Sequence, residues 1–232
     1  MKLRKLLYFF FFNLLISCGV LPPENNFHET KNTLELGTIG IKKKSSRKTD
    51  FEELGTPYYQ GLIKFSVISK SFDKNTYNKY LKSVKNKKVF NKINYVDSLK
   101  IKPSYLEIKI SDKVAVIKAI NNDNPSLCEY MKNAPKAKLI TSLRLTASKS
   151  LITQVLKGDA FYLTSDTQKK QRLYIYKNQV KIGEINTNEN DVFAYEMGSF
   201  CWELTAKRKI KLATIIGPNE SCTNSTKEKA RD

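Results

Sequence analysis

Five acidic residues in the second half of the chain are candidates for acid–base catalysis. They are Asp159, Glu184, Asp191, Glu196 and Glu203. A glycoside hydrolase needs two carboxyl groups roughly 5–10 Å apart. Acidic side chains on the polar face of a strand normally face solvent. A hydrolase that acts on glycans or peptides through a carboxylate pair is therefore an alternative hypothesis, and we assign no catalytic residue.

Other residues with catalytic or ligating chemistry are scarce. The chain has one histidine, His28, and four cysteines, which excludes most His-dependent triads, histidine-cluster metal sites and four-cysteine zinc sites. It contains no glycine-rich phosphate loop, no dinucleotide fingerprint, no HExxH sequence and no GxSxG sequence. We therefore expect no metal, no cofactor and a body that does not catalyse a reaction.

The charge of the chain is strongly positive. Its 41 Lys and Arg residues outnumber its 22 Asp and Glu residues, which gives a formal charge of +19. Only six of the cations are Arg, the residue that bidentate phosphate recognition favours. We expect no nucleic-acid partner. Weak contact with acidic lipid headgroups, lipopolysaccharide or polysaccharide is the remaining electrostatic hypothesis, and salt would screen it.

Aromatic side chains offer a second candidate binding surface. A sugar-stacking or peptide-binding platform could be built from Tyr58, Tyr59, Tyr174, Tyr176, Phe193, Tyr195 and Trp202. The alternative is that these rings pack in the core or cover a sheet.

The first residues of the chain have the layout of an export signal. Lys2, Arg4 and Lys5 precede residues 6–16, which are apolar apart from Asn13. As a helix, such a run is only about 16 Å long, too short to span about 30 Å of hydrocarbon. A basic start followed by a short apolar run is typical of an export signal.

The end of this run, Leu15-Ile16-Ser17-Cys18, resembles the lipobox of bacterial lipoproteins. The resemblance implies cleavage before Cys18, a diacylglycerol thioether on its sulfur and an acyl group such as palmitate on its new α-amine. Membrane lipid would then be a partner through acylated Cys18. Gly19 stands where an aspartate would imply retention in the inner membrane, so the resemblance implies the outer membrane, on its periplasmic or surface side. An ordinary signal peptide with an incidental cysteine is the alternative.

Three cysteines remain beyond Cys18, and an odd number permits at most one internal bridge. Disulfides persist in exported proteins. A Cys201–Cys222 bridge would attach the C-terminal residues to a strand. Cys128–Cys222 pairing and three free thiols are the alternatives.

Composition divides the chain into four segments. Residues 1–17 are the expected signal peptide, and residues 18–57 are an expected lipid-anchored polar tether, because so polar a segment buries too little apolar surface to offset its ordering entropy. A short strand within residues 34–41 is compatible with this interpretation. Residues 58–218 form the expected single β-rich domain, and residues 219–232 form a polar C-terminal tail.

Period-two alternation of apolar residues predicts most elements of the body as strands. The expected strands cover residues 63–67, 139–146, 161–163, 173–176, 180–182, 200–204 and 210–216, and residues 105–110 and 114–117 are expected to form a hairpin. Asp73 is the expected N-cap of a helix with Tyr77, Tyr80, Leu81 and Val84 on one face, and a shorter helix follows Asn124-Pro125. The pattern predicts a mainly β fold, an antiparallel sandwich or barrel with one or two helices, with α+β as the alternative.

These expectations combine into one leading hypothesis. The chain is a lipid-anchored cell-envelope protein with a non-catalytic binding or scaffolding β domain, whose partner is another envelope protein or a polysaccharide. An anchored hydrolase is the first alternative. An inhibitor or immunity protein for an exported toxin is the second.

Overall fold

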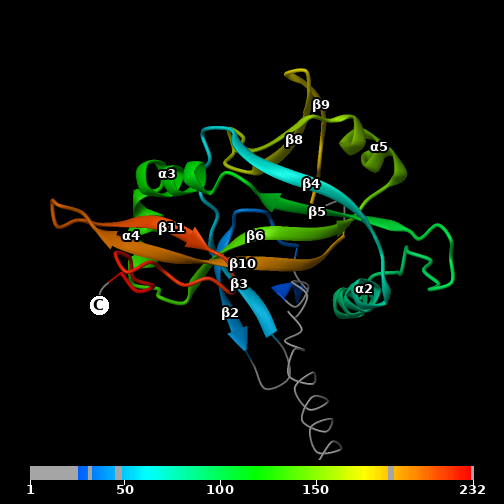
Figure 1. Cartoon of the computed structure of the whole chain (residues 1–232), viewed down its shortest axis with the longest axis horizontal. Coiled ribbons are helices and arrows are strands. Elements are labelled where there is room, and N and C mark those ends of the chain that lie inside the picture. Colours follow the sequence, from blue (N-terminus) through cyan, green and yellow to red (C-terminus); the bar gives the residue numbers. More distant parts are fainter. Residues whose placement is uncertain (1–25, 31–32, 45–48, 188–190, 231–232) are drawn as a thin grey trace, which may run out of the picture.

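The computed structural model describes residues 26–30, 33–44, 49–187 and 191–230, and within them the protein is mainly β (Figure 1). The strands are β1 (His28–Glu29), β2 (Ile39–Lys44), β3 (Thr49–Gly55), β4 (Ile63–Ser71), β5 (Ser104–Ile110), β6 (Ala137–Thr146), β7 (Ala160–Ser165), β8 (Gln171–Lys177), β9 (Val180–Glu184), β10 (Val192–Leu204) and β11 (Ile210–Ile216). The helices are α2 (Lys74–Lys87), α3 (Lys113–Asp123), α4 (Pro125–Lys132) and α5 (Lys149–Lys157). The expected mainly β class is confirmed.

The described strands form one branched antiparallel sheet that is not closed into a barrel. Its main order is β1-β10-β6-β5-β4-β7-β8-β9. β11 pairs with the second half of β10, and β2 pairs with the start of β6 and carries β3 on its other edge. β10 and β6 therefore lie at the centre, where segments far apart in the sequence meet.

Helices cover both faces of the sheet. Side chains of β5 alternate between the faces: Ile108 belongs to a larger core, and Tyr105 belongs to a smaller one. The larger core lies under α3, α4 and α5, whereas the smaller core lies under α2 and consists mainly of aromatic rings. Among the helices that the structure describes, none is long and apolar enough to cross a membrane.

Two predicted helices are present, and the first begins at its predicted N-cap, Asp73. The backbone N–H of Thr76 donates to Asp73 Oδ1 at 2.7 Å, and the Asp73 N–H donates to Thr76 Oγ1 at 2.9 Å, so a capping box starts α2. α4 starts at Pro125, whose missing N–H is no loss in the first turn of a helix. A two-residue turn with positive φ at Asn178 and Gln179 joins β8 to β9.

The predicted hairpin at residues 105–117 is wrong, because its second strand is helix α3. The Asp112 carboxylate accepts a hydrogen bond from the N–H of Ala115 at 2.9 Å and caps this helix. Val116, Ala119 and Ile120 are buried at helical spacing. A run of four apolar residues fits either period, and packing on β11 selects the helix. Helix α5, capped by Ser148, was not predicted either.

The expected polar tether is wrong over its described part, because residues 27–30, 33–44 and 49–57 belong to the folded body. β1 pairs with β10, and β2 pairs with β6. Phe27, Leu36, Ile39 and Phe51 are buried. At Gly37, a positive φ lets the chain turn while its N–H donates to Ile140 O at 2.8 Å. The strands that order this segment, β6 and β10, lie about 100 residues or more further along the chain, so local composition does not reveal them.

Candidate functional site

Cys18, with Leu15, Ile16 and Ser17, lies outside the described residues. The lipid-attachment hypothesis for Cys18 therefore stays a prediction from the sequence.

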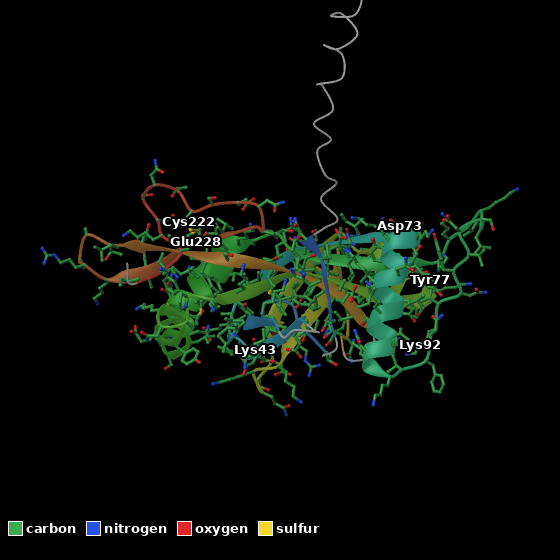
Figure 2. All side chains as sticks on the ribbon, turned by 90° about the horizontal axis from the view of Figure 1, so that it is seen from below. Lys43, Asp73, Tyr77, Lys92, Cys222 and Glu228 are labelled. Atoms are coloured by element: carbon green, nitrogen blue, oxygen red, sulfur yellow. A yellow bond between two sulfur atoms is a disulfide. The ribbon has the colours of Figure 1, made fainter. Side chains whose placement is uncertain are left out.

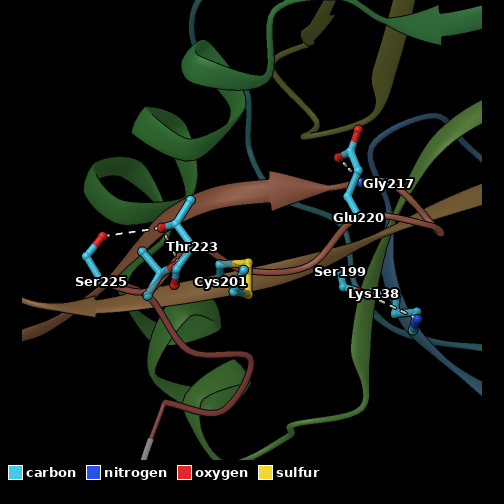
Figure 3. Close-up of a disulfide and its surroundings, with 9 residues drawn as sticks. Lys138, Ser199, Cys201, Gly217, Glu220, Thr223 and Ser225 are labelled. Atoms are coloured by element: carbon cyan, nitrogen blue, oxygen red, sulfur yellow. Dashed lines mark hydrogen bonds between the residues drawn. A yellow bond between two sulfur atoms is a disulfide. The ribbon is translucent and has the colours of Figure 1, made fainter.

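Cys201 and Cys222 form a disulfide (Figure 3). Cys201 is buried in β10, and Cys222 belongs to the segment after β11. Farther along this segment, Trp202 and Lys227 exchange two backbone hydrogen bonds, at 2.7 and 2.9 Å. The C-terminal residues 222–228 are therefore attached along β10 and are not a loose tail.

The acidic candidates are spread along the second half of the chain, with Glu196 and Glu203 both on β10, and each has a polar partner. Arg172 pairs with Glu184, Lys92 with Asp191, Lys109 with Glu196 and Lys211 with Glu203, at 3.2, 3.2, 3.8 and 2.9 Å. Asp159 accepts a hydrogen bond from the N–H of Asn178 at 2.8 Å. Each of the five carboxylates therefore contacts a cation or a backbone N–H donor.

The aromatic candidates do not form one exposed platform. Tyr59, Phe193, Tyr195 and Trp202 are buried. Tyr58, Tyr174 and Tyr176 are half-buried, and Lys181 Nζ lies 3.5 Å from the ring centroid of Tyr174. Most of these rings therefore pack in the cores.

A cleft of about 280 Å³ lies where β2, β6 and β10 run side by side. Its polar lining is Lys42, Lys136, Lys138, Ser199 and Glu228, and its apolar lining is Met131, Ala134, Pro135, Ala137, Phe200 and Trp202. We call it the lysine cleft. It combines three cations and one carboxylate with an apolar wall that contains the only tryptophan of the chain.

A tight turn places Lys136 at the rim of the lysine cleft. The N–H of Ala137 donates to Ala134 O at 2.8 Å, which closes a turn with Pro135 at its second position. Proline presets the backbone angle that this position needs. Lys136 follows as an exposed corner residue. It forms no ion pair with any residue that the structure describes.

Strand pairing places Lys138 and Ser199 opposite each other across β6 and β10. Lys138 Nζ donates to Ser199 Oγ at 3.1 Å, and this contact is drawn in Figure 3. A hydroxyl leaves two of the three ammonium protons of a lysine available. Lys42 comes from β2, where its Nζ lies 3.2 Å from His28 Nε2.

The C-terminal segment forms one wall of the lysine cleft. Glu228 lines the cleft directly after Lys227, the residue that pairs with Trp202. The disulfide holds this segment against β10 at Cys201, between Phe200 and Trp202. The bridge therefore helps to hold the C-terminal wall of the cleft in place.

Ammonium groups beside an apolar wall are suited to an anionic ligand. Lysine supplies positive charge and rotatable N–H donors to a carboxylate or phosphate, and the wall of Phe200 and Trp202 would cover an apolar part of the ligand. Among the described residues, no group of His, Cys, Asp and Glu side chains could hold a metal ion. The arrangement of these side chains can therefore bind an anionic ligand.

Arg144 is the other notable charged residue, and it is almost completely buried, with 2% of its surface exposed. Its Nε donates to Glu107 Oε2 at 2.7 Å, and Lys70 Nζ donates to Glu107 Oε1 at 3.0 Å. Burial alone would raise the pKa of Glu107, but Lys70 and Arg144 outweigh it and hold that pKa below its usual value. These residues form an ion network inside the fold rather than a binding site.

Two further hollows have linings that are less suited to an anionic ligand than the lysine cleft is. A shallow groove of about 570 Å³ between α3, α4 and the β10–β11 turn contains the buried thiol of Cys128, whose pKa is raised by burial. A polar hollow of about 130 Å³ surrounds Arg172, which already pairs with Asp166 and Glu184.

The sequence did not single out Lys136, Lys138 or Ser199. With 35 lysines in the chain, no individual lysine stands out. The Ala134-Pro135-Lys136-Ala137 turn was the available local signal, and it becomes informative only when β10 is known to lie beside it. Comparison with protein-family models, with curated proteins and with solved structures finds no match to this chain.

Proposed function

We propose that this chain is a lipid-anchored protein of the bacterial cell envelope whose β-rich body binds an anionic ligand in the lysine cleft. The anchor is acylated Cys18, and the ligand is a carboxylate- or phosphate-bearing component of the envelope. The observation that carries the binding role is the convergence of Lys136 and Lys138 on an apolar wall that contains Trp202.

The anchor is supported by the Leu15-Ile16-Ser17-Cys18 sequence and by the physics of acyl chains. A single myristoyl-sized chain binds a bilayer only reversibly, with an association constant near ~10⁴ M⁻¹, and each further buried CH₂ adds ~0.8 kcal/mol. Two or three chains on one residue would therefore hold the protein in a membrane for practical purposes permanently.

The binding role is supported by the charge of the cleft and by its construction. Among the described residues, Lys136 has no carboxylate partner and Lys138 forms no ion pair, while its Nζ donates to the neutral hydroxyl of Ser199. Phe200 and Trp202 are fixed by strand pairing and by the adjacent disulfide. A site that is ordered before binding loses less entropy when its ligand arrives.

Metabolic labelling with radioactive palmitate tests the anchor. The wild-type chain should incorporate label and change its mobility, and Cys18→Ser should do neither. Fractionation alone is a weaker test, because the uncleaved signal of the variant can itself hold the chain in a membrane. Equal labelling of both proteins would show that Cys18 is not the anchor.

Native mass spectrometry of protein extracted from the envelope tests the ligand. The wild-type chain should carry an additional mass that Lys136→Glu with Lys138→Glu loses. Lys64→Glu, on an exposed position of β4 outside the cleft, is the matched control and should retain it. Binding in the cleft would be contradicted if wild type, the double variant and Lys64→Glu all lack the additional mass, or if all three carry it.

A further inference from the structure

The segment after α2 exposes an unusual number of large apolar side chains. Phe90 and Ile101 are 91% and 89% exposed, and Val89, Val96 and Leu99 are each at least 40% exposed. These five side chains lie within residues 89–102, which we call the apolar loop. Isolated exposed apolar residues are ordinary, but such a concentration in one loop marks an interaction surface.

The base of the apolar loop is held in place, so its exposed side chains are presented by an ordered support. Tyr77 Oη donates to Ile93 O at 3.2 Å, and the N–H of Lys92 donates to Tyr80 Oη at 3.0 Å. The rings of Tyr95 and Tyr77 lie 4.7 Å apart. Ile93 and Tyr95 thus pack on α2 and the smaller core, while Phe90 and Ile101 point away from it.

Lysines surround these apolar side chains. Lys88, Lys92, Lys100 and Lys102 flank or belong to the loop, which contains one acid, Asp97. Lys92 pairs with Asp191 and Lys102 with Asp97. Lys88 and Lys100 form no ion pair with a described residue. Apolar residues bordered by lysines are typical of surfaces that enter the headgroup region of anionic membranes.

The N-terminal segment meets the body at the same helix. Ser83 Oγ of α2 donates to Thr30 O at 2.9 Å, and Lys82 of α2 pairs with Glu29 at 3.1 Å. Cys18 precedes Phe27 by nine positions. Nine residues of fully extended chain span about 30 Å, which is the greatest separation between the two residues. An acyl group on Cys18 would therefore keep α2 and the apolar loop close to the bilayer.

We propose that the apolar loop docks the body onto an anionic bilayer, with Phe90 and Ile101 inserted among the acyl chains and Lys88 and Lys100 at the headgroups. This inference rests on the lipid anchor of the proposed function, because the anchor supplies the proximity. Figure 2 places Asp73, Tyr77 and Lys92 at one end of the molecule and Cys222 and Glu228 towards the other. Docking through the α2 end would thus leave the lysine cleft away from the membrane.

Fluorescence quenching by brominated lipids tests this inference with the acylated full chain. The vesicles contain phosphatidylcholine and phosphatidylglycerol that are brominated on their acyl chains. Acylated wild type, Phe90→Trp or Leu204→Trp is bound to them. The native Trp202 is buried, so wild type gives the baseline. Leu204 is 67% exposed at the end of β10, outside the apolar loop, and serves as the matched control.

The inference predicts that the added emission of Phe90→Trp shifts to shorter wavelength and loses intensity, and that Leu204→Trp shows neither change. The quenching should weaken when phosphatidylglycerol is omitted, because the lysines then lose their partner. If Phe90→Trp floats with the vesicles but is not quenched, docking of the loop on the bilayer is overturned. The apolar loop would then contact a protein partner or a second copy of the chain. Failure to float would contradict the anchor, and with it this inference.

Discussion

The phenyl ring of Phe27 lies over the guanidinium group of Arg144, with 3.8 Å between Cζ and the ring centroid. Arg144 lies near the C-terminal end of β6, and its Nε donates to Glu107 on β5. Phe27 comes from the first described residues of the chain. This cation–π contact therefore joins the segment that follows the expected anchor to the centre of the sheet.

Phe27→Ala should destabilise the fold by about 3 kcal/mol, because it removes a buried ring and uncovers a buried cation. Chemical denaturation measures the loss. Limited proteolysis should then cut near residues 28–30, which are protected in wild type by β1 pairing and by Ser83. Phe90→Ala is the matched control, since Phe90 is exposed, and its stability should stay within about 0.5 kcal/mol of wild type. Equal losses of stability in Phe27→Ala and Phe90→Ala would contradict the packing of Phe27 on Arg144.

Glu107→Gln should destabilise the protein by about 3 kcal/mol, because it leaves Arg144 buried without its carboxylate. Denaturation at neutral pH measures this effect. Glu203→Gln, which breaks a partly exposed pair with Lys211, is the control and should cost less than about 1 kcal/mol.

The same pair predicts a pH dependence. The pKa of Glu107 is lower in the folded protein than its ordinary value, so the folded state favours the ionised carboxylate. The stabilisation that the ionised Glu107 contributes is fully present above the ordinary glutamate pKa of about 4.3. It is lost as the pH falls through the lowered pKa of Glu107 in the folded protein. Glu107→Gln should therefore lose less stability than wild type between pH 5 and the acid limit of folding. Parallel pH profiles would contradict this assignment.

Reduction of the Cys201–Cys222 disulfide should loosen the C-terminal wall of the lysine cleft. With a sequence separation of 21, the chain-entropy model gives the bridge about 3 kcal/mol. Cys222→Ser should lose this stabilisation and increase proteolysis after residue 217. Peptide mapping without reductant should recover Cys201 linked to Cys222 in wild type and in Cys128→Ser. Alkylated Cys222 from unreduced protein would contradict the bridge.

The sequence predicted the elements whose signals are local. The alternation in Leu139–Thr146 and the Asp73 cap of α2 needed no knowledge of distant residues. The wrong predictions concern segments whose structure depends on residues that are distant in the sequence. Val114–Ile117 fits a strand or a helix, and only the neighbouring β11 decides. Phe27, Leu36 and Phe51 stand among polar residues, yet they are buried because β6 and β10 supply hydrogen-bond partners from far along the chain.

The lysine cleft was beyond local sequence reasoning for the same reason. Its lining comes from β2, α4, the α4–β6 turn, β6, β10 and the C-terminal segment. Pro135 marks a turn beside Lys136, but nothing near Ser199 in the sequence marks it as part of a site. Trp202 was noted as an aromatic, but its role as a wall beside two lysines depends on the pairing of β6 with β10.

The emission of Trp202 measures binding in the lysine cleft most directly, because it is the only tryptophan of the chain and lines the cleft. Phenyl phosphate is the probe, and benzyl alcohol is its neutral counterpart. We predict a saturable change with phenyl phosphate and none with benzyl alcohol. Lys136→Ala and Lys138→Ala should each weaken binding about tenfold, the loss of one charge-assisted hydrogen bond, whereas Lys64→Ala should bind as wild type does. No saturable response in wild type, or equal weakening by Lys64→Ala, would contradict the proposed anion-binding role.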